Sequence, residues 1–364
     1  MNLANLYGSQ TDPYYIYTPA WRTNSAGIRA LHYLCHSLNS IGQKAFLVIP
    51  ASYKSTNLVN ANLNTPILTK EMVREHKRYN LDPIVIYSET VPGNPLNSTN
   101  TVRYLMNYVG LLGGQRKFSE NEFLLAFSQN IATDYFNKNG KEVHSVLFLP
   151  PSDPREFEVN RNKNQHRKDF YLLYAAKYRN FVGNHPQLPN IPMIEIKRDS
   201  KFAQTRSELI ELLGQCRGVI AFENSAIISE AVLSGVPGYF IENEFLEQAI
   251  AEAELGWDGM GWGFTSEIEL QAHNTLENGI ERYLDSVSKY FESLSIFVNL
   301  TQSREENLPP TEIKLPEGKF GLMLHRFRLA KQIFQNLGFR RLLRVCRAYF
   351  LKNLRTKSPD NSTF

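Results

Sequence analysis

The stretch that decides the fold is GVIAFENSAIISEAVLSGVPGYFI, residues 218–241. It opens with a continuous apolar run, GVIAF at 218–222, and passes into helical spacing at about 224–234. A glycine and a proline then separate this helix from a second apolar run, PGYFI at 237–241. Strand, helix and strand in this order predict a parallel βαβ unit whose strands are covered on both faces.

The same alternation continues on both sides of this stretch, which predicts an α/β chain with two Rossmann-like βαβ domains facing across a cleft. In the N-terminal half, strands are expected at 14–19, 44–50, 82–89, 122–128 and 143–150, and helices at 28–41 and 98–109. In the C-terminal half, further strands are expected at 170–176 and 192–198, and further helices at about 205–215, 244–255 and 275–298.

Polar and proline-marked segments divide the chain into the predicted domains. The segment at 151–168 is charged and carries two prolines, which is typical of a junction, and the segment at 299–318 has the composition of a linker. The expected boundaries are an N-terminal domain at 1–150, the junction at 151–168, a C-terminal domain at 169–298, the linker at 299–318 and a basic tail at 319–364.

Composition and charge describe a globular body with a separate basic end. The 364 residues are 42% hydrophobic and 21% charged, which excludes a disordered chain. The formal net charge is only +4, but residues 319–364 hold eleven Lys or Arg and one Asp, a charge of +10 that leaves −6 on residues 1–318. An acidic body does not favour a broad nucleic-acid surface, so no nucleic-acid partner is expected.

The basic tail predicts an amphipathic element at an anionic membrane surface. Two helical pieces meet at Gly338, and in the second piece aromatic and leucine residues share one face. Arginines occupy the other side, among them Arg340, Arg341, Arg344 and Arg347. A second interpretation stays open, in which the apolar face packs on the protein body or on another subunit.

The location expected for the chain is cytoplasmic. Cys35, Cys216 and Cys346 are far apart and form neither a CxxC pair nor a disulfide framework. The N-terminus lacks the basic and apolar regions of a secretory signal, and no run reaches 18 apolar residues. Together with the tail, these features predict peripheral association with the inner face of the cytoplasmic membrane.

Polar residues at the end of the strand 218–222 form the first candidate site, because ligands of open α/β sheets bind outside the carboxyl ends of strands. The carboxylate of Glu223 can accept two hydrogen bonds from a ribose diol. Asn224 or Ser225 can cap the following helix, whose free N–H groups can bind a phosphate. Glu230 lies within that helix. The alternative is a capping turn beside a solvent-facing glutamate.

The loop after the first strand, Asn24-Ser25-Ala26-Gly27, is a second candidate because small residues let a ligand approach the backbone. It matches neither the dinucleotide fingerprint nor a Walker A loop, so classical dinucleotide and ATP sites are disfavoured. His32 lies in the following helix and can face the cleft. Glu89, in the loop after the strand 82–89, can hold an acceptor hydroxyl or act as a base. Capping and purely structural roles remain the alternatives for all of these residues.

Three cations follow strands of the C-terminal half or open its helices: Lys177, Arg198 and Arg206. Cations at the carboxyl ends of strands can stabilise the charge of a departing diphosphate, so no cofactor and no metal is expected to be required. The alternative is that they are solvated surface charges.

The segment Glu230-Ala231-Val232-Leu233-Ser234-Gly235-Val236-Pro237 resembles the nucleotide-sugar-binding region of GT-B glycosyltransferases, especially the retaining family of bacterial polysaccharide and lipopolysaccharide synthesis. That motif has two glutamates, then EA, a few residues, and G-x-P. Six residues separate Glu223 from Glu230, where the family usually has seven. The N-terminal TPAWRTNSAGIRALHYLCHSLNSIGQKAFLV looks like the opening strand, loop, helix and strand of the same class.

This resemblance implies transfer of a hexosyl-type sugar, with retention, from a nucleotide-sugar to a glycan or lipid-linked acceptor in bacterial surface polysaccharide synthesis. The N-terminal domain would face the acceptor and the C-terminal domain would bind the donor. The catalytic residues implied are Glu89, Arg198 and Lys177; the donor-binding residues are Glu230, Glu223, Asn224, Ser225, Gly27 and Arg206; the acceptor-side residues are Asn24, Ser25 and His32. Two alternatives stay open: a nucleotide-sugar 2-epimerase of the same fold, and a catalytically degenerate membrane-bound scaffold.

Overall fold

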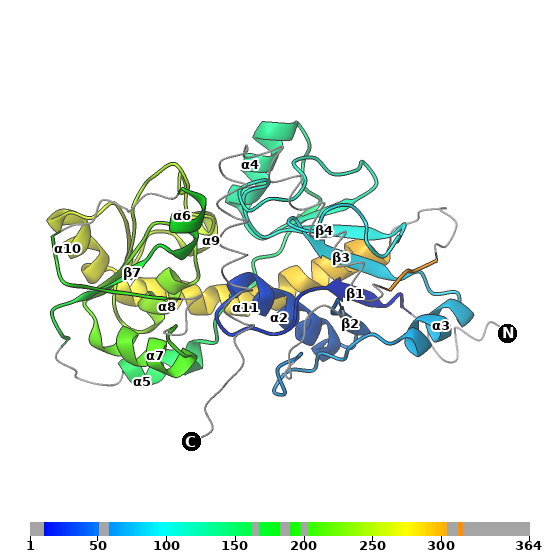
Figure 1. Ribbon diagram of the computed structural model, residues 1–364, viewed down its shortest axis with the longest axis horizontal. Coiled ribbons are helices and arrows are strands. Elements are labelled where there is room, and N and C mark those ends of the chain that lie inside the picture. The colour runs from blue at the N-terminus through cyan, green and yellow to red at the C-terminus, as the bar shows by residue number, and fades with distance from the viewer. Residues whose placement is uncertain are drawn as a thin grey trace, which may run out of the picture. The chain divides into compact units, whose positions relative to one another are not determined.

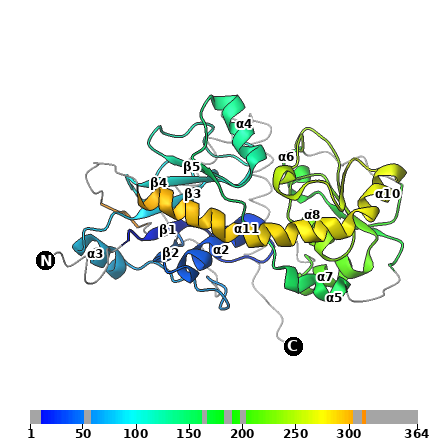
Figure 2. The same cartoon turned by 180° about the vertical axis from the view of Figure 1, so that it is seen from behind.

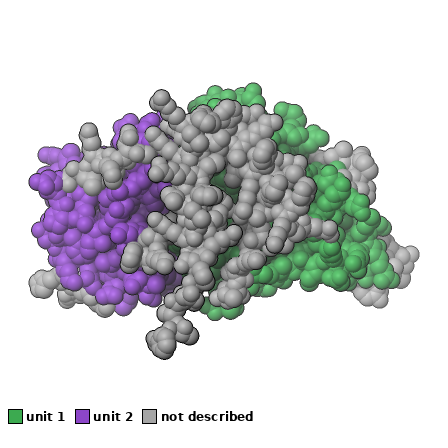
Figure 3. Space-filling model, viewed as in Figure 1, with its two compact units in different colours: residues 1–151, 250–254, 284–329 green, residues 152–249, 255–283, 330–364 purple. Residues whose placement is uncertain are grey.

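A computed structural model describes residues 11–50, 58–161, 167–182, 190–197, 203–303 and 312–315. The chain divides into two compact units (Figure 3). Each unit is built on one parallel sheet. This confirms the predicted class of two parallel α/β domains. Unit 1 comprises 1–151, 250–254 and 284–329, and unit 2 comprises 152–249, 255–283 and 330–364.

Unit 1 contains six strands in the order β2-β1-β3-β4-β5-β6, all of them parallel (Figure 1). The strands consist mainly of β-branched and aromatic residues, and all but β6 are almost wholly buried, as expected for a parallel sheet. The elements are β1 (Tyr14–Tyr17), α2 (Ala26–Ser40), β2 (Ala45–Val48), α3 (Lys70–Arg78), β3 (Ile84–Ser88), β4 (Thr101–Leu105), β5 (Phe123–Ala126), α4 (Gln129–Asn139) and β6 (Ser145–Val146).

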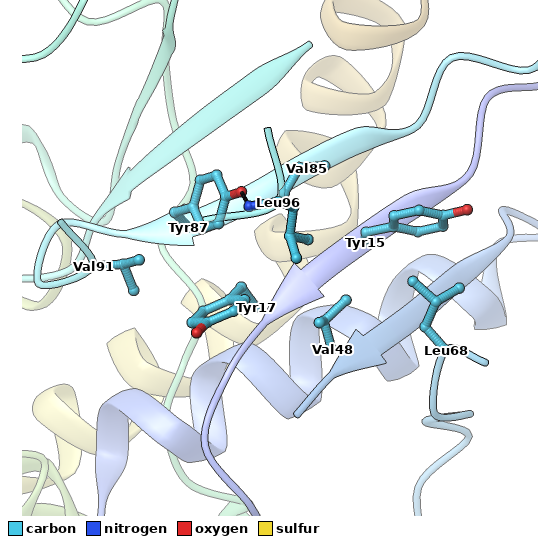
Figure 4. Packing of buried hydrophobic residues seen from close by; sticks show 8 residues of the cluster. All are labelled: Tyr15, Tyr17, Val48, Leu68, Val85, Tyr87, Val91 and Leu96. Carbon is cyan, nitrogen blue, oxygen red and sulfur yellow. Dashed lines mark hydrogen bonds between the residues drawn. The ribbon is translucent and has the colours of Figure 1, made fainter. Parts of the chain in front are cut away.

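The two faces of this sheet are covered by different parts of the chain. The second half of α11 (Leu276–Gln302) lies over one face, where the Tyr14 hydroxyl is 2.7 Å from Thr301 Oγ1 and the Tyr14 ring packs on Phe297 (Figure 2). Neighbouring residues of a strand point to opposite faces, so Tyr15 lies on the other side. There it belongs to a cluster of eight buried hydrophobic residues (Figure 4).

Unit 2 contains five parallel strands in the order β11-β10-β9-β7-β8. Arg206 begins a helix whose N-cap, Thr205, forms a capping box with Glu208. The elements are η1 (Pro154–Phe157), α5 (Glu158–Arg161), β7 (Tyr171–Tyr174), α6 (Ala176–Phe181), β8 (Met193–Glu195), α7 (Arg206–Gln215), β9 (Gly218–Ala221), α8 (Ile227–Leu233), β10 (Gly238–Phe240), β11 (Met260–Trp262) and α10 (Ser266–Asn274). A short helix, α9 (Glu252–Leu255), lies at a boundary between the units.

The long helix α11 contributes to both units. Its residues up to Tyr283 belong to unit 2, and those from Leu284 belong to unit 1. The sequence analysis instead placed the whole helix, at 275–298, in the C-terminal domain. Residues 312–315, expected in a linker, are extended: Ile313 and Leu315 pack on the buried cluster of unit 1, and the Lys314 N–H donates to the Leu96 carbonyl at 2.9 Å.

Two predicted helices were wrong. The helix expected at 98–109 is the strand β4, whose five residues are all buried between β3 and β5. Burial on both faces removes the alternation that identifies a strand, and an apolar run then has no diagnostic period. The helix expected at 244–255 shortens to α9, because the Asn243 side chain accepts from the Phe245 N–H at 2.8 Å and donates to the Ile241 carbonyl at 2.7 Å. Such local bonds compete with helical ones.

Four further observations complete the description. The helices α3, α4, α5, α6 and α10 and the strand β11 were not predicted. Cys35, in unit 1, and Cys216, in unit 2, are buried free thiols.

The predicted membrane tail, with Arg340, Arg341, Arg344 and Arg347, lies outside the described residues. Within the described residues, no helix combines the length and apolar character needed to cross a membrane.

Candidate functional site

The sheet of unit 2 reverses its strand order between β7 and β9. The strand β7 pairs with β8 on one side and with β9 on the other. The chain therefore passes from β7 to β8 on one side, and the connection after β8 crosses to the opposite side of β7. In open α/β sheets the crevice at such a switch point, outside the carboxyl ends of the strands, is where ligands bind. Lys177 follows β7 and Glu223 follows β9. The structure therefore brings these two predicted residues together at that edge.

Glu223 is a fully buried carboxylate with one satisfied oxygen. Its Oε2 accepts the N–H of Tyr178 at 2.7 Å, while Oε1 has no hydrogen-bond partner among the described residues. The Lys177 ammonium, 36% exposed, lies 3.9 Å from this Oε1 and donates to the Asn224 carbonyl at 3.3 Å. A buried oxygen that lacks a donor, beside a cation near solvent, suits a ligand that carries both hydroxyl and phosphate groups.

The turn that carries Glu223 is fixed by side-chain amides. Asn243, after β10, donates to the Phe222 carbonyl at 3.1 Å, and Asn224 donates to the Gln248 carbonyl at 2.9 Å. Asn224 is thus a bracing residue in this structure. The cap of α8 is Ala226, while Ser225 Oγ accepts from the Ile227 N–H at 3.4 Å. The predicted N-cap at Asn224 or Ser225 lies before the observed one, because α8 begins after Ala226.

Glu230 lies in a different environment, a buried ion cluster between α8 and the start of α7. Its Oε1 accepts from Ser152 Oγ at 2.6 Å and lies 3.0 Å from Nη1 of Arg206. The Glu230 side chain is 2% exposed and that of Arg206 is 19% exposed. Burial does not distinguish Glu230 from Glu223, which is 0% exposed; the two carboxylates differ because Oε1 of Glu230 already has two partners.

Arg206 is held by more than Glu230. Its Nε donates to Oε2 of Glu156 at 3.0 Å, and its guanidinium lies over the ring of Phe157, 5.1 Å from the centroid. Burial alone would lower the pKa of Arg206, but the negative charges of Glu230 and Glu156 outweigh that effect and the pKa is raised. Arg206 is a partly buried ion-pair partner here, and the interpretation as a solvated surface charge does not describe it.

The G-x-P part of the motif ends α8, as the sequence predicted, and the sequence analysis missed the arginine that braces this turn. Gly235 has a φ of +75°, which favours glycine, and ends α8. Arg167 donates to the carbonyls of Ser234 and Gly235 at 3.0 and 3.2 Å and to those of Leu213 and Gly214 at 3.1 and 2.6 Å. One guanidinium thus satisfies the final carbonyls of α7 and the turn after α8. The sequence offered no signal for this role, because Arg167 lies in the segment interpreted as a junction.

Unit 1 has its own switch point, between β1 and β3. Glu89 follows β3 and is buried, and its Oε2 accepts the Met106 N–H at 3.1 Å. A Cβ on Gly114, whose φ is +87°, would collide with the Glu89 carbonyl oxygen, so a second loop packs directly on this residue. Glu89 lies at the predicted edge of the sheet, with one carboxylate oxygen engaged by the backbone.

The loop after β1 leads into α2 at the same edge. Ser25 is the N-cap of α2, without a side-chain cap bond, and Asn24 precedes it. A Cβ on Gly27 would meet only Met106 Cε at 3.8 Å, so glycine is not sterically required there. His32 is fully buried; its Nε2 is 3.1 Å from the Pro19 carbonyl, and burial lowers its pKa. His32 thus holds the loop after β1.

Arg103, in the middle of β4, is a buried residue that the sequence analysis missed. Its Nε donates to Glu122 Oε2 at 2.7 Å, and its other nitrogens donate to the carbonyls of Val91 and Gly93 at 2.7 and 2.9 Å. The side chain is fully buried. Arg103 therefore fixes the loop that begins at Glu89, and no periodicity could have identified it because β4 was expected to be a helix.

Arg198, predicted to be catalytic, lies outside the described residues. Within the part of the chain that the structure describes, no group of His, Cys, Asp and Glu has the arrangement of a metal site.

No family model and no curated protein matches the sequence. Solved structures match over most of the chain at low identity. WaaG, described as a glycosyltransferase involved in lipopolysaccharide biosynthesis, is 11% identical with a TM-score of 0.40, covering 80% of this chain and 100% of its own. A glycosyltransferase from Rickettsia africae is 11% identical with a TM-score of 0.47, covering 82% and 100%. The T4 phage protein BGT, solved with UDP-glucose, is 10% identical with a TM-score of 0.41, covering 80% and 100%. These values are too low to carry a conclusion about the activity of this chain.

Proposed function

We propose that this protein is a glycosyltransferase that moves a sugar from a nucleotide-sugar donor to a glycan or lipid-linked acceptor. The observation that carries the proposal is the pair formed by Glu223 and Lys177 at the switch point of unit 2. A buried carboxylate oxygen without a donor, 3.9 Å from an ammonium, fits a ligand with hydroxyls and phosphates. The resemblance of residues 230–237 to the donor-binding motif of GT-B glycosyltransferases supports the same class.

Each residue of the donor site has a proposed role. Glu223 Oε1 accepts a ribose hydroxyl, and Lys177 binds the diphosphate and stabilises the charge that develops on it as the sugar leaves. Arg198 acts on the same diphosphate. Asn224 and Ser225 hold the turn. A metal is not required in this scheme because the cations supply the positive charge.

The role of Glu230 differs from the one that the motif suggests. Its Oε1 already has two partners, Ser152 and Arg206, whereas Oε1 of Glu223, which is equally buried, has no hydrogen-bond partner among the described residues. We propose that Glu230 positions Arg206 and that Glu223 makes the ribose contact.

The acceptor belongs at the switch point of unit 1 in this proposal. Glu89 binds or deprotonates the acceptor hydroxyl, while Asn24, Ser25 and His32 shape the loop beside it. Hexosyl transfer with retention, a setting in bacterial surface polysaccharide synthesis and a location on the inner face of the cytoplasmic membrane follow from the resemblance and from the basic tail. The anomer of the product, observed by NMR during transfer, tests retention.

The experiment that tests the donor site is a thermal-shift panel of UDP-, GDP-, dTDP- and CMP-sugars on the full chain and two variants. We expect one donor class to raise the melting temperature. Glu223→Gln should weaken that donor about tenfold or more, since it removes a charged hydrogen-bond acceptor. Glu281→Gln, an exposed change in unit 2, should bind the donor like the unchanged chain.

Other outcomes separate the alternatives. If no nucleotide or nucleotide-sugar shifts the melting temperature, the glycosyltransferase proposal fails and a scaffold remains. If a donor binds and the protein converts it to its 2-epimer without an acceptor, the activity is that of an epimerase. If Glu230→Gln loses donor binding and Glu223→Gln keeps it, the residue that contacts the ribose is Glu230, as the motif suggests, and not Glu223.

A further inference from the structure

A groove of about 700 Å³ lies in unit 1, between the helix α3 and the extended segment 312–315. The segment is drawn in orange beside α3 in Figures 1 and 2. Part of the groove is also lined by residues 80–83, which lead into β3 at its amino end. The candidate sites described above lie at the carboxyl ends of strands. The groove is therefore a separate feature, and nothing in the proposed transfer reaction uses it.

Cations dominate the rim of the groove. Lys70, Arg74 and Lys77 are spaced i, i+4 and i+7, so they share one side of α3, and all three are exposed. Lys314 faces the groove from the opposite wall. Two acidic residues, Asp82 and Glu312, also line the groove, which leaves an excess of two positive charges.

The floor of the groove is apolar and firmly built. Val73, Ile313 and Leu315 line it and also pack on the buried cluster of unit 1, which is drawn in Figure 4. The backbone bond from Lys314 to Leu96, 2.9 Å long, fixes the far wall. A cationic rim above an apolar floor matches a ligand that is anionic at one end and apolar at the other.

Two neighbouring features indicate a membrane surface as the source of such a ligand. Tyr79, at the end of α3, is 52% exposed, and amphipathic aromatic residues are typical of membrane interfaces. The basic stretch of the sequence begins at Lys319, four residues after Leu315, which is part of the groove wall. In the sequence, the region of highest positive charge thus begins shortly after the last residue of the groove.

We propose that this groove binds the phosphate-bearing headgroup of an anionic lipid, with the adjoining part of the lipid on the apolar floor. Lys70, Arg74, Lys77 and Lys314 contact the phosphate. A soluble phosphate would leave the floor without a role, and the charge balance of the body does not favour a nucleic acid. The inference does not rest on sugar transfer, because it concerns binding at a separate place.

The test measures binding of the full chain to phosphatidylcholine vesicles with and without phosphatidylglycerol. A groove variant carries Lys70→Gln, Arg74→Gln and Lys77→Gln. A matched control carries Lys138→Gln, Lys168→Gln and Lys289→Gln, all exposed positions elsewhere, so both variants lose three positive charges and keep the tail. We expect the groove variant to bind phosphatidylglycerol vesicles about tenfold or more weakly than the control variant.

Hydrogen exchange supplies a second readout that does not depend on any variant. Amides at 70–83 and 312–315 should exchange more slowly on phosphatidylglycerol vesicles than on phosphatidylcholine vesicles. Equal vesicle binding by the two triple variants would overturn the proposal. Equal protection by glycerol phosphate alone would overturn the lipid assignment, because it would identify a soluble anion as sufficient.

Discussion

The carboxylate of Glu230 and the guanidinium of Arg206 form a buried pair in which each partner offsets the cost of burying the other. Ser152 donates to the same Glu230 oxygen, and its backbone is bonded in turn to the Tyr283 hydroxyl. Removing one member of such a pair leaves an uncompensated charge, which costs more than the pair itself contributes.

We expect Arg206→Ala to lower the free energy of unfolding by about 3 kcal/mol because it leaves Glu230 buried without its counter-ion. Adding Glu230→Gln to this variant should recover part of the loss, since the remaining side chain is then neutral. Urea denaturation of the two single variants and the double variant measures both effects. Arg217→Ala is the control: Arg217 is 45% exposed in its ion pairs, so the cost should stay below about 1 kcal/mol. Equal costs for the two arginines would contradict the proposed cluster.

Buried histidines make the stability of the fold depend on pH. Burial is the first cause of a lowered pKa at His32 and His76. A base whose pKa is lower in the folded state binds fewer protons there than in the unfolded chain, so stability is complete above the unfolded pKa of about 6.5 and is lost as the pH falls toward the folded value.

His32→Gln should therefore flatten the decline of the urea midpoint between about pH 6.5 and pH 5, while lowering the midpoint at pH 7.5 if the bond to Pro19 is lost. Each such histidine contributes at most about 1.4 kcal/mol per pH unit. An unchanged slope in His32→Gln would show that His32 titrates alike in both states.

At the scale of single elements, β4 shows how a buried ion pair can brace a loop. Arg103 lies between the rings of Tyr87 and Phe118, at 5.1 and 5.0 Å from their centroids, and donates to the loop after β3. That loop begins at Glu89, so the position of the proposed acceptor residue depends on a side chain in the neighbouring strand.

Arg103→Met should lower the free energy of unfolding by about 3–5 kcal/mol, because Glu122 and the loop carbonyls lose their buried donor. Amides of residues 89–93 should also exchange faster with solvent, as measured by hydrogen exchange. Lys138→Met is a control, since Lys138 is 60% exposed in its pair with Asp134 and should cost below about 1 kcal/mol. Unchanged exchange in the loop would refute a bracing role for Arg103.

The same elements show what the sequence can and cannot predict. The strand β9, the helix α8 and the strand β10 were predicted from period and composition, and so was the parallel arrangement. The strand β4 was missed because a segment buried on both faces has no alternation. The position of Glu223 at the end of β9 was predictable; the engagement of Glu230 by Arg206 was not, since it depends on the packing of α8 near η1 and α7.

At the scale of the whole molecule, α11 is a continuous helix whose first part belongs to unit 2 and whose second part belongs to unit 1. Tyr283 is buried in unit 2, where its hydroxyl bonds to Ser152, and Thr301 is buried in unit 1, where its hydroxyl bonds to Tyr14. Each unit therefore relies on a portion of the same helix.

A proline within this helix should affect both units at once. Ser288→Pro changes an exposed position, removes a helical hydrogen bond and costs about 3 kcal/mol. We expect differential scanning calorimetry to show a lower midpoint and a broader or divided transition. Ser288→Ala, which keeps the helix, should melt like the unchanged chain. A single sharp transition in Ser288→Pro would show that the units do not depend on the continuity of α11.

The two buried thiols have a practical consequence. Cys35 lies in unit 1 and Cys216 in unit 2, and burial raises the pKa of both, that of Cys216 to about 12. Since the thiolate is the reactive form, neither should react with maleimide at neutral pH while its unit is folded. Once Cys346 is replaced by serine, the chain holds one cysteine in each unit, and each of them should be unreactive while its unit is folded. Pulse labelling followed by mass spectrometry of the two peptides would then time the opening of each unit separately, with no added probe.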